Sequence, residues 1–296
     1  MPLLGAHQSI AGGYHRAVDR AVAAGCECLQ IFTKSTNRWE SPPLTDEQVA
    51  QFQTALVRSG IRRVIGHTAY LINVASPDPT LWKKSVESLA EEYSRADRLG
   101  LEGLVLHPGA AMSEDRDGAA ARVAEALNRV LERFPMAKPL ILLETTAGQG
   151  TNLGSSFEEL ATIVEATEQS HRVGICWDTC HMLAADYPID HPDGWNKTVR
   201  WFDRILGLHR LRAIHLNDSR SPRGSRVDRH EHIGRGHVGL ETFRRLLHDP
   251  RVNHLPMFLE TPKGKTDDGR HWDVVNLTVL RELLVRTPAV SPQEPL

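Results

Sequence analysis

The sequence has no apolar stretch long enough to cross a membrane. None of its hydrophobic runs approaches the ~20 consecutive apolar residues that a transmembrane helix needs. Residues 1–13 have neither a basic start nor an extended apolar core, so we expect no secretory signal peptide. These two absences predict a cytoplasmic protein without a membrane partner.

Cysteine is scarce, and the formal net charge is close to zero. None of the four cysteines, Cys26, Cys28, Cys176 and Cys180, belongs to a CxxC pair. We therefore expect buried structural thiols in a reducing compartment rather than a disulfide framework.

The net charge of −2 lacks the basic excess that is typical of nucleic-acid-binding proteins. A polyanion would therefore have to be recognised by a local group of cations.

Short apolar runs alternate with amphipathic segments along the whole chain. The segment 80–99 has the clearest helical pattern, because its apolar residues recur at steps of three and four and share one face. Thr45 and Ser156, each followed three residues later by Gln or Glu, are signals for helix N-termini. The predicted strands are 3–7, 28–33, 64–67, 104–107, 140–144, 173–178, 211–216 and 257–260. The predicted helices are 14–24, 45–59, 80–99, 119–134, one that starts after Ser156, 195–206, 240–247 and 274–285.

Eight β-α units in succession predict a single-domain α/β fold, the (β/α)8 TIM barrel, because parallel strands joined by helices close into a barrel at this number. A doubly wound sheet is the alternative, but no glycine-rich dinucleotide fingerprint follows the first strand. We assign residues 1–286 to the barrel. We expect 287–296, which contain three prolines, to form a flexible tail.

Side chains of the types that bind metal ions stand at the C-terminal ends of seven predicted strands. In a parallel barrel these ends meet at one face, where the active site forms. One such histidine alone would more often be a hydrogen-bonded core residue, but the set as a whole indicates a metal centre. We expect His7 to support the ligands from behind rather than to bind an ion. The set consists of His7, His67, His107, Glu144, Asp178, His215 and Glu260.

Three further candidate ligands follow the sixth and seventh strands. His181 lies three residues after Asp178, and the i, i+2 spacing of Asp228 and His230 puts both on one side of an extended segment. With the six other strand-end ligands they make nine, which suits three ions, or two richly held ions with spare groups. Clustered divalent ions favour phosphoryl chemistry by a metal-bound hydroxide. Five arginines between 220 and 235 suit a phosphate ester.

Several longer motifs accompany these ligands. They are F-T-K at 32–34, Y-L-I-N at 70–73, H-P-G at 107–109, E-T-T-A-G-Q-G at 144–150, D-T-C-H at 178–181, H-L-N-D at 215–218 and G-S-R-V-D-R-H at 224–230. In these motifs, and over nearly the whole chain, the sequence resembles endonuclease IV, a family of zinc-dependent abasic-site endonucleases that have TIM barrels.

The resemblance implies three zinc ions per chain, with Glu144 shared by two of them. It also implies that Glu144 and Glu260 act in catalysis together with a metal-bound hydroxide. The first ion would be held by His67, His107 and Glu144, the second by Glu144, Asp178, His215 and Glu260, and the third by His181, Asp228 and His230.

The implied reaction is hydrolysis of the phosphodiester 5′ to an abasic site in double-stranded DNA, which leaves a 3′-hydroxyl and a 5′-deoxyribose phosphate. Blocked 3′ ends would be a second substrate, and the protein would act as a monomer at the nucleoid. Some family members have an arginine and then a glutamine where Asn37 and Arg38 stand here, so we expect Arg38 to open the duplex from the adjacent position. The implied DNA contacts are Lys34, Arg38, Tyr70, Asn73, Arg226 and Arg229.

Two other functions compete with this interpretation. A metal-dependent sugar isomerase or epimerase would use the second ligand set, but it has no use for His181, Asp228 and His230 or for the arginine-rich loop. A non-catalytic lesion-binding protein would tolerate an incomplete ligand set, and this set is complete.

Overall fold

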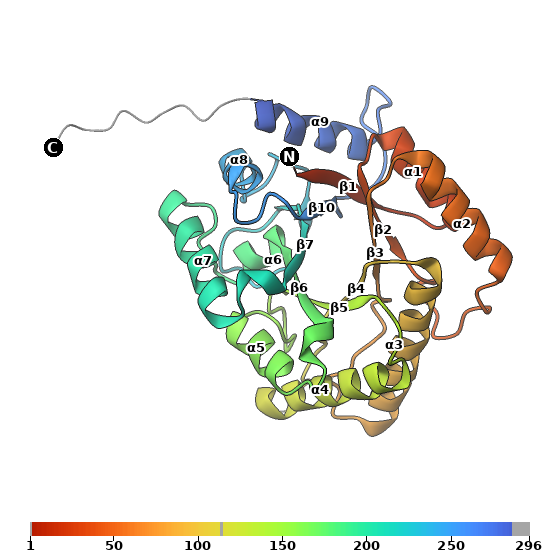
Figure 1. Ribbon diagram of the computed structural model, residues 1–296. Coiled ribbons are helices and arrows are strands. Elements are labelled where there is room, and N and C mark those ends of the chain that lie inside the picture. Colours follow the sequence, from red (N-terminus) through yellow and green to blue (C-terminus); the bar gives the residue numbers. More distant parts are fainter. Residues whose placement is uncertain (1, 113–114, 286–296) are drawn as a thin grey trace.

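The computed structural model describes residues 2–112 and 115–285, and the expected tail at 287–296 lies outside them. Within these residues eight parallel strands close into a barrel in the order β1-β10-β7-β6-β5-β4-β3-β2, surrounded by helices (Figure 1). The predicted TIM barrel is confirmed. The strands are β1 (Leu3–Gln8), β2 (Cys28–Phe32), β3 (Arg63–His67), β4 (Gly103–Leu106), β5 (Leu140–Glu144), β6 (Val173–Asp178), β7 (Leu211–His215) and β10 (Pro256–Leu259).

Two of the outer helices begin at the expected signals. Thr45 forms a full capping box with Gln48 at the start of α2, and the Ser156 side chain accepts a hydrogen bond from Glu159 N at the start of α5. Gly100 ends α3 in the left-handed conformation (φ 74°), which a residue with a side chain rarely adopts. The barrel helices are α1 (Tyr14–Ala24), α2 (Asp46–Ser59), α3 (Pro79–Leu99), α4 (Arg116–Arg133), α5 (Phe157–Glu165), α7 (Pro192–Ile205), α8 (Leu240–His248) and α9 (Trp272–Val285), with 3₁₀ turns at Ser170–Arg172 and Leu208–Arg210.

The barrel interior is filled by apolar side chains, so it is a packed core and not a channel. All four cysteines are free and buried, as the sequence predicted. The interior cluster consists of Cys28, Ile65, Val105, Leu142, Cys176, Ala213 and Phe258.

The segment between 178 and 232 has more regular structure than the sequence predicted. A short helix, α6 (Thr179–Ala184), follows β6 directly, because the Asp178 side chain accepts a hydrogen bond from His181 N and caps it. Residues expected to form a loop contain a two-stranded antiparallel sheet, β8 (Asp218–Ser219) with β9 (His230–Glu231). Elements of two and six residues are too short to show a hydrophobic period in the sequence.

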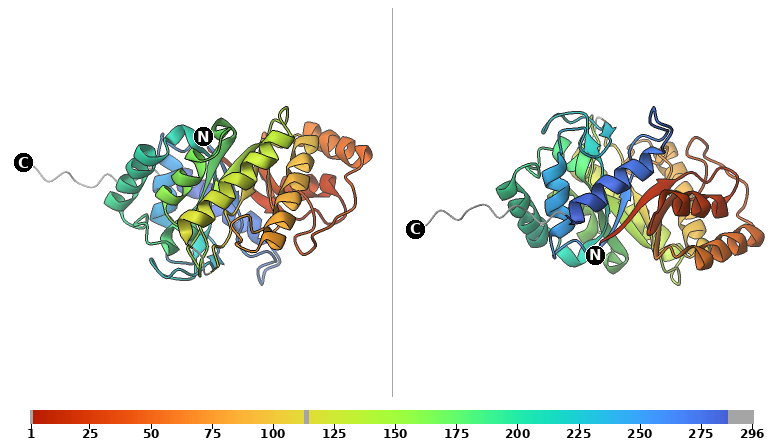
Figure 2. Two further views of the ribbon diagram at one scale, coloured as in Figure 1. Left: turned by 90° about the horizontal axis from the view of Figure 1, so that it is seen from below. Right: turned by 90° about the horizontal axis from the view of Figure 1, so that it is seen from above.

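The loops that follow the barrel strands project from the end of the barrel opposite the N-terminus of β1, as the side views show (Figure 2). They include the loop that carries β8 and β9 and the loop between β10 and α9. No helix among the described residues combines the length and apolar character needed to span a membrane.

Candidate metal centre

Glu144, at the end of β5, lies at the centre of the candidate ligands. Its Oε2 atom is 3.2 Å from Nε2 of His67 and 3.0 Å from Nε2 of His107. Two ligand atoms about 2.1 Å from one tetrahedral zinc ion stand about 3.4 Å apart, so this spacing suits a shared ion. The barrel thus brings together the expected first ligand set, with His67 ending β3 and His107 one residue beyond β4.

The other oxygen of Glu144 faces a second set. Glu144 Oε1 is 3.1 Å from Nδ1 of His215. The same Nδ1 atom is 3.2 Å from Oε2 of Glu260 and 3.8 Å from Oδ2 of Asp178. Since its two oxygens face different groups of ligands, Glu144 is placed to bridge two ions.

The third set is assembled from elements that are distant in the sequence. His181 Nε2 on α6 lies 3.1 Å from Oδ1 of Asp228, and His230 Nε2 on β9 lies 3.5 Å from the same oxygen. The two imidazole nitrogens are 3.4 Å apart. Asp178 Oδ2 is also 3.5 Å from His230 Nε2, so Asp178 stands between the second and third sets.

Cys180 also converges with Asp228 and His230, although the sequence indicated only a structural thiol. Burial raises the pKa of the Cys180 thiol to about 12. The side chain is therefore a neutral thiol near pH 7, which agrees with a structural role beside the third set.

Charges of opposite sign stabilise one another in the buried part of the centre. Glu144 and His215 are fully buried. Burial alone would raise the pKa of Glu144, but His107 and His215 hold it well below its ordinary value. Burial would lower the pKa of His215, but Cys176 and Glu260 raise it well above the ordinary value. Glu144 is thus ionised and ready to bind a cation, which must displace a proton from His215.

His7, which is predicted to support the ligands from behind, lies next to Glu260. Its Nδ1 atom is 3.2 Å from Glu260 Oε1, and its ring packs on Phe32 at 4.2 Å between centroids. Sequence reasoning missed Gln30, a fully buried neighbour that contacts His7, Glu260 and His215. The available signal was a long polar side chain inside the otherwise apolar strand β2.

Four of the six expected DNA contacts are exposed on loops at the ligand-bearing end of the barrel. Tyr70 is 66% exposed, and its ring centroid lies 5.7 Å from that of His67. Arg38 follows β2, while Arg226 and Arg229 flank Asp228, and all three are exposed. These side chains are accessible to a large ligand that covers the metal centre.

Lys34 is predicted to contact DNA, but its side chain is buried and bonded to other residues of the protein. Only 2% of the residue is exposed, and its Nζ donates hydrogen bonds to Trp39 O, Ser88 Oγ and Glu91 Oε2. A buried ammonium with three partners is not free to reach a phosphate. Lys34 instead anchors the loop that presents Arg38.

Asn73 is also committed to the protein itself. Its Nδ2 donates to Ala110 O, and its Oδ1 accepts from the main-chain N–H groups of Ala75 and Ala110. Asn73 therefore joins the loop after β3 to the loop after β4. A contact between Asn73 and DNA stays a prediction.

Two pockets flank the metal centre, and Tyr70 lines both. One, of about 650 Å³, reaches His7 and Glu260. The other, of about 340 Å³, reaches His67, His107 and Asp228. Tyr70 thus lines two pockets that reach different ligand sets.

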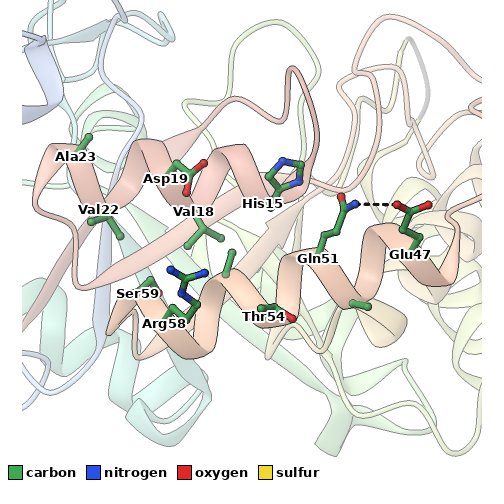
Figure 3. A pocket seen from close by; sticks show the side chains of 12 residues that line it. His15, Val18, Asp19, Val22, Ala23, Glu47, Gln51, Thr54, Arg58 and Ser59 are labelled. Atoms are coloured by element: carbon green, nitrogen blue, oxygen red, sulfur yellow. Dashed lines mark hydrogen bonds between the residues drawn. The ribbon is translucent and has the colours of Figure 1, made fainter.

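A larger pocket than these two lies elsewhere in the barrel. Its volume is about 920 Å³, and it runs between α1 and α2 with His15, Gln51 and Arg58 among its lining residues (Figure 3). None of the convergent ligand groups found in the described part of the chain lies there. Pocket size alone would therefore have pointed to the wrong part of this barrel.

Known proteins that are similar in sequence to this chain belong to one TIM-barrel family. A family model described as xylose isomerase-like TIM barrel matches residues 18–281. The chain is 49% identical over 280 residues to "Probable endonuclease 4" from Trichlorobacter lovleyi, covering 95% of this chain and 99% of the relative. It is 44% identical over 292 residues to "Probable endonuclease 4" from Geobacter sulfurreducens, covering 99% and 98%.

Two solved structures resemble this chain in fold. The crystal structure of endonuclease IV from Thermus thermophilus superposes with a TM-score of 0.84 at 37% identity, over 96% of this chain and 99% of that one. A D-tagatose 3-epimerase-like protein superposes with a TM-score of 0.71 at 18% identity, over 95% and 97%. The second likeness shows a common fold alone.

Proposed function

The chain belongs to the endonuclease IV family of xylose isomerase-like TIM barrels, and on that premise we propose that it hydrolyses the phosphodiester 5′ to abasic sites in double-stranded DNA. The products would be a 3′-hydroxyl and a 5′-deoxyribose phosphate. Removal of blocking groups from 3′ ends would be a second activity of the same centre. All nine ligands come from one chain, so we propose that the protein acts as a monomer, and its DNA substrate would bring it to the nucleoid.

The third ligand set is the observation that carries this proposal. A sugar epimerase of this fold needs one metal site, for which the second set would suffice. His181, Asp228 and His230 add three donor atoms that lie 3.1–3.5 Å from one another. A third cation beside two others suits a phosphodiester, whose attacking and leaving oxygens both need charge stabilisation.

The donor atoms fit zinc. Imidazole nitrogens and carboxylate oxygens are ordinary zinc ligands, and their separations match those around a tetrahedral ion. Zinc supplies Lewis acidity, which lowers the pKa of water and offsets negative charge on a phosphate. Glu144 and Glu260 are the expected catalytic carboxylates. Both oxygens of Glu144 contact histidines of the centre, and both oxygens of Glu260 contact His215 or His7, so the two side chains would hold the zinc ions in fixed positions.

The surroundings of the centre support binding of a DNA duplex. Tyr70 offers an exposed aromatic face, and Arg38 a flat guanidinium, for stacking at the lesion. Arg226 and Arg229 place positive charge beside Asp228, where the backbone would pass. An abasic nucleotide is cheap to extrude because it has no base to unstack.

The test is incision of an end-labelled duplex with one tetrahydrofuran abasic analogue, with zinc and after chelation. This analogue lacks the aldehyde that β-elimination requires, so cleavage of it reports hydrolysis. We expect zinc-dependent cleavage to a 3′ end that a DNA polymerase extends directly. Absence of cleavage by zinc-loaded protein, or a borohydride-trapped covalent complex with a natural abasic site, would refute the proposed reaction.

A further inference from the structure

Gln30, in the middle of β2, is a buried amide whose polar atoms all contact the metal centre. The residue has 0% exposure. Its Nε2 atom lies 2.5 Å from Glu260 Oε1 and 2.9 Å from His7 Nδ1, and its Oε1 atom lies 2.8 Å from His215 Nε2. Gln30 therefore touches two ligands of the second set and the residue that supports one of them.

Glu260 determines which way the Gln30 amide faces. An ionised carboxylate can only accept hydrogen bonds, and an amide nitrogen has two hydrogens to donate. The reversed amide would place two acceptor oxygens 2.5 Å apart with no hydrogen between them. The nitrogen of Gln30 must therefore face Glu260, and its oxygen must face His215.

The orientation of the amide in turn selects one tautomer of His215. The Gln30 oxygen only accepts, so His215 Nε2 must carry a hydrogen. In the neutral imidazole the lone pair is then on Nδ1, the atom that faces Glu144 and Glu260. This is the form that a metal ligand requires.

Three other imidazoles of the centre are oriented differently. The Nδ1 atoms of His67, His181 and His230 face main-chain carbonyl oxygens, of Thr68 at 2.7 Å, of Thr145 at 2.8 Å and of Glu260 at 3.2 Å. These oxygens do not depend on side-chain identity. The Nδ1 atom of His181 also lies 3.3 Å from Oε1 of Glu144, which is itself a candidate ligand. Among these four imidazoles, His215 is the one whose remote nitrogen faces a side chain outside the ligand sets.

We propose that Gln30 is a positioning residue that selects the metal-binding tautomer of His215 and orients the Glu260 carboxylate, and so raises the zinc affinity of the second set. The proposal rests on the proposed zinc-dependent function. It concerns metal binding, which is measured without DNA.

The test compares two buried glutamines on adjacent strands. Gln30→Leu removes all three contacts at similar volume, and Gln8→Leu is the matched control, because Gln8 Nε2 donates to Asp273 Oδ2 at 2.8 Å, outside the ligand sets. Zinc affinity and stoichiometry are measured by chelator competition, ligand geometry by visible absorption of the cobalt-loaded proteins, and folding by thermal unfolding of the metal-free proteins. For Gln30→Leu we expect one ion to bind about 10–100-fold more weakly and the cobalt spectrum to change. Gln8→Leu should bind metal like the parent protein.

Two results would overturn the proposal. One is zinc affinity of Gln30→Leu within about twofold of the parent protein, and the other is an equal loss in Gln8→Leu, which would indicate general core damage. Failure of the proposed function looks different, since the unaltered protein would then bind its zinc ions and leave abasic DNA intact.

Discussion

Substitution of Asp228 by asparagine tests the third ligand set directly. Asn keeps the size of the side chain but removes the negative charge that binds His181 Nε2 at 3.1 Å and His230 Nε2 at 3.5 Å. We expect zinc content to fall by about one ion per chain. The fold should persist, because Asp228 lies between β8 and β9 and outside the barrel strands.

The size of the effect on rate follows from the charge that is lost. One electrostatic contact to the transition state contributes about 3–4 kcal/mol, which corresponds to about 10²–10³-fold in kcat. The effect on metal-free stability should be much smaller. The Asp228 side chain is 41% exposed, and ion pairs that solvent reaches contribute about 0–1 kcal/mol.

The assay combines zinc analysis, incision of abasic duplex and thermal unfolding with and without zinc. Asp190→Asn is the matched control, since Asp190 binds Arg223 at 3.1 Å and belongs to none of the ligand sets. Asp228→Asn protein that kept its full zinc content and its incision rate would refute the assignment of the third set. Loss of zinc together with loss of the fold would refute the claim that this set is separable from the barrel.

Three further predictions follow from individual side chains. Lys34→Met should lower the free energy of unfolding in urea titrations by about 1–3 kcal/mol, since three buried hydrogen bonds are lost. The salt dependence of DNA binding should stay unchanged, and a decrease of about one in the slope of log binding constant against log salt concentration would identify Lys34 as a phosphate contact. Arg38→Ala should weaken binding to abasic duplex by about 1–3 kcal/mol in fluorescence titrations and change binding to undamaged duplex little; equal losses on both duplexes with a reduced salt slope would mean that Arg38 touches a phosphate. In the metal-free protein, burial lowers the pKa values of His181 and His215, but Asp178 and Asp228 raise that of His181, and Cys176 and Glu260 raise that of His215, to above the ordinary value. The stability from these contacts is therefore present below about pH 6.5 and is lost as the pH rises through the raised values. Zinc needs the deprotonated imidazoles, so the increase in Tm on adding zinc should grow with pH, and an increase that shrinks with rising pH would contradict the ligand assignment.

The sequence alone determined the barrel and the face that carries the centre. Eight apolar runs separated by helices leave a closed parallel sheet as the simple solution, and the C-terminal ends of its strands necessarily meet at one face. The position of Glu144 or His215 at the end of a strand can therefore be read without coordinates. Shifts of one residue, such as His107 just beyond β4, do not alter this result.

The resemblance implied which ligands group together, but residue patterns alone do not decide which of these side chains meet, and the tertiary structure supplies those contacts. The pairing of His181 with Asp228 depends on α6 and on the β8–β9 sheet, which are too short to leave a period in the sequence. The burial of Lys34 depends on Ser88 and Glu91, which lie more than 50 residues away and are brought close by the packing of α3 on the barrel. Contacts of this kind are set by strand register and helix packing over long sequence separations, and local patterns of residue type do not encode them.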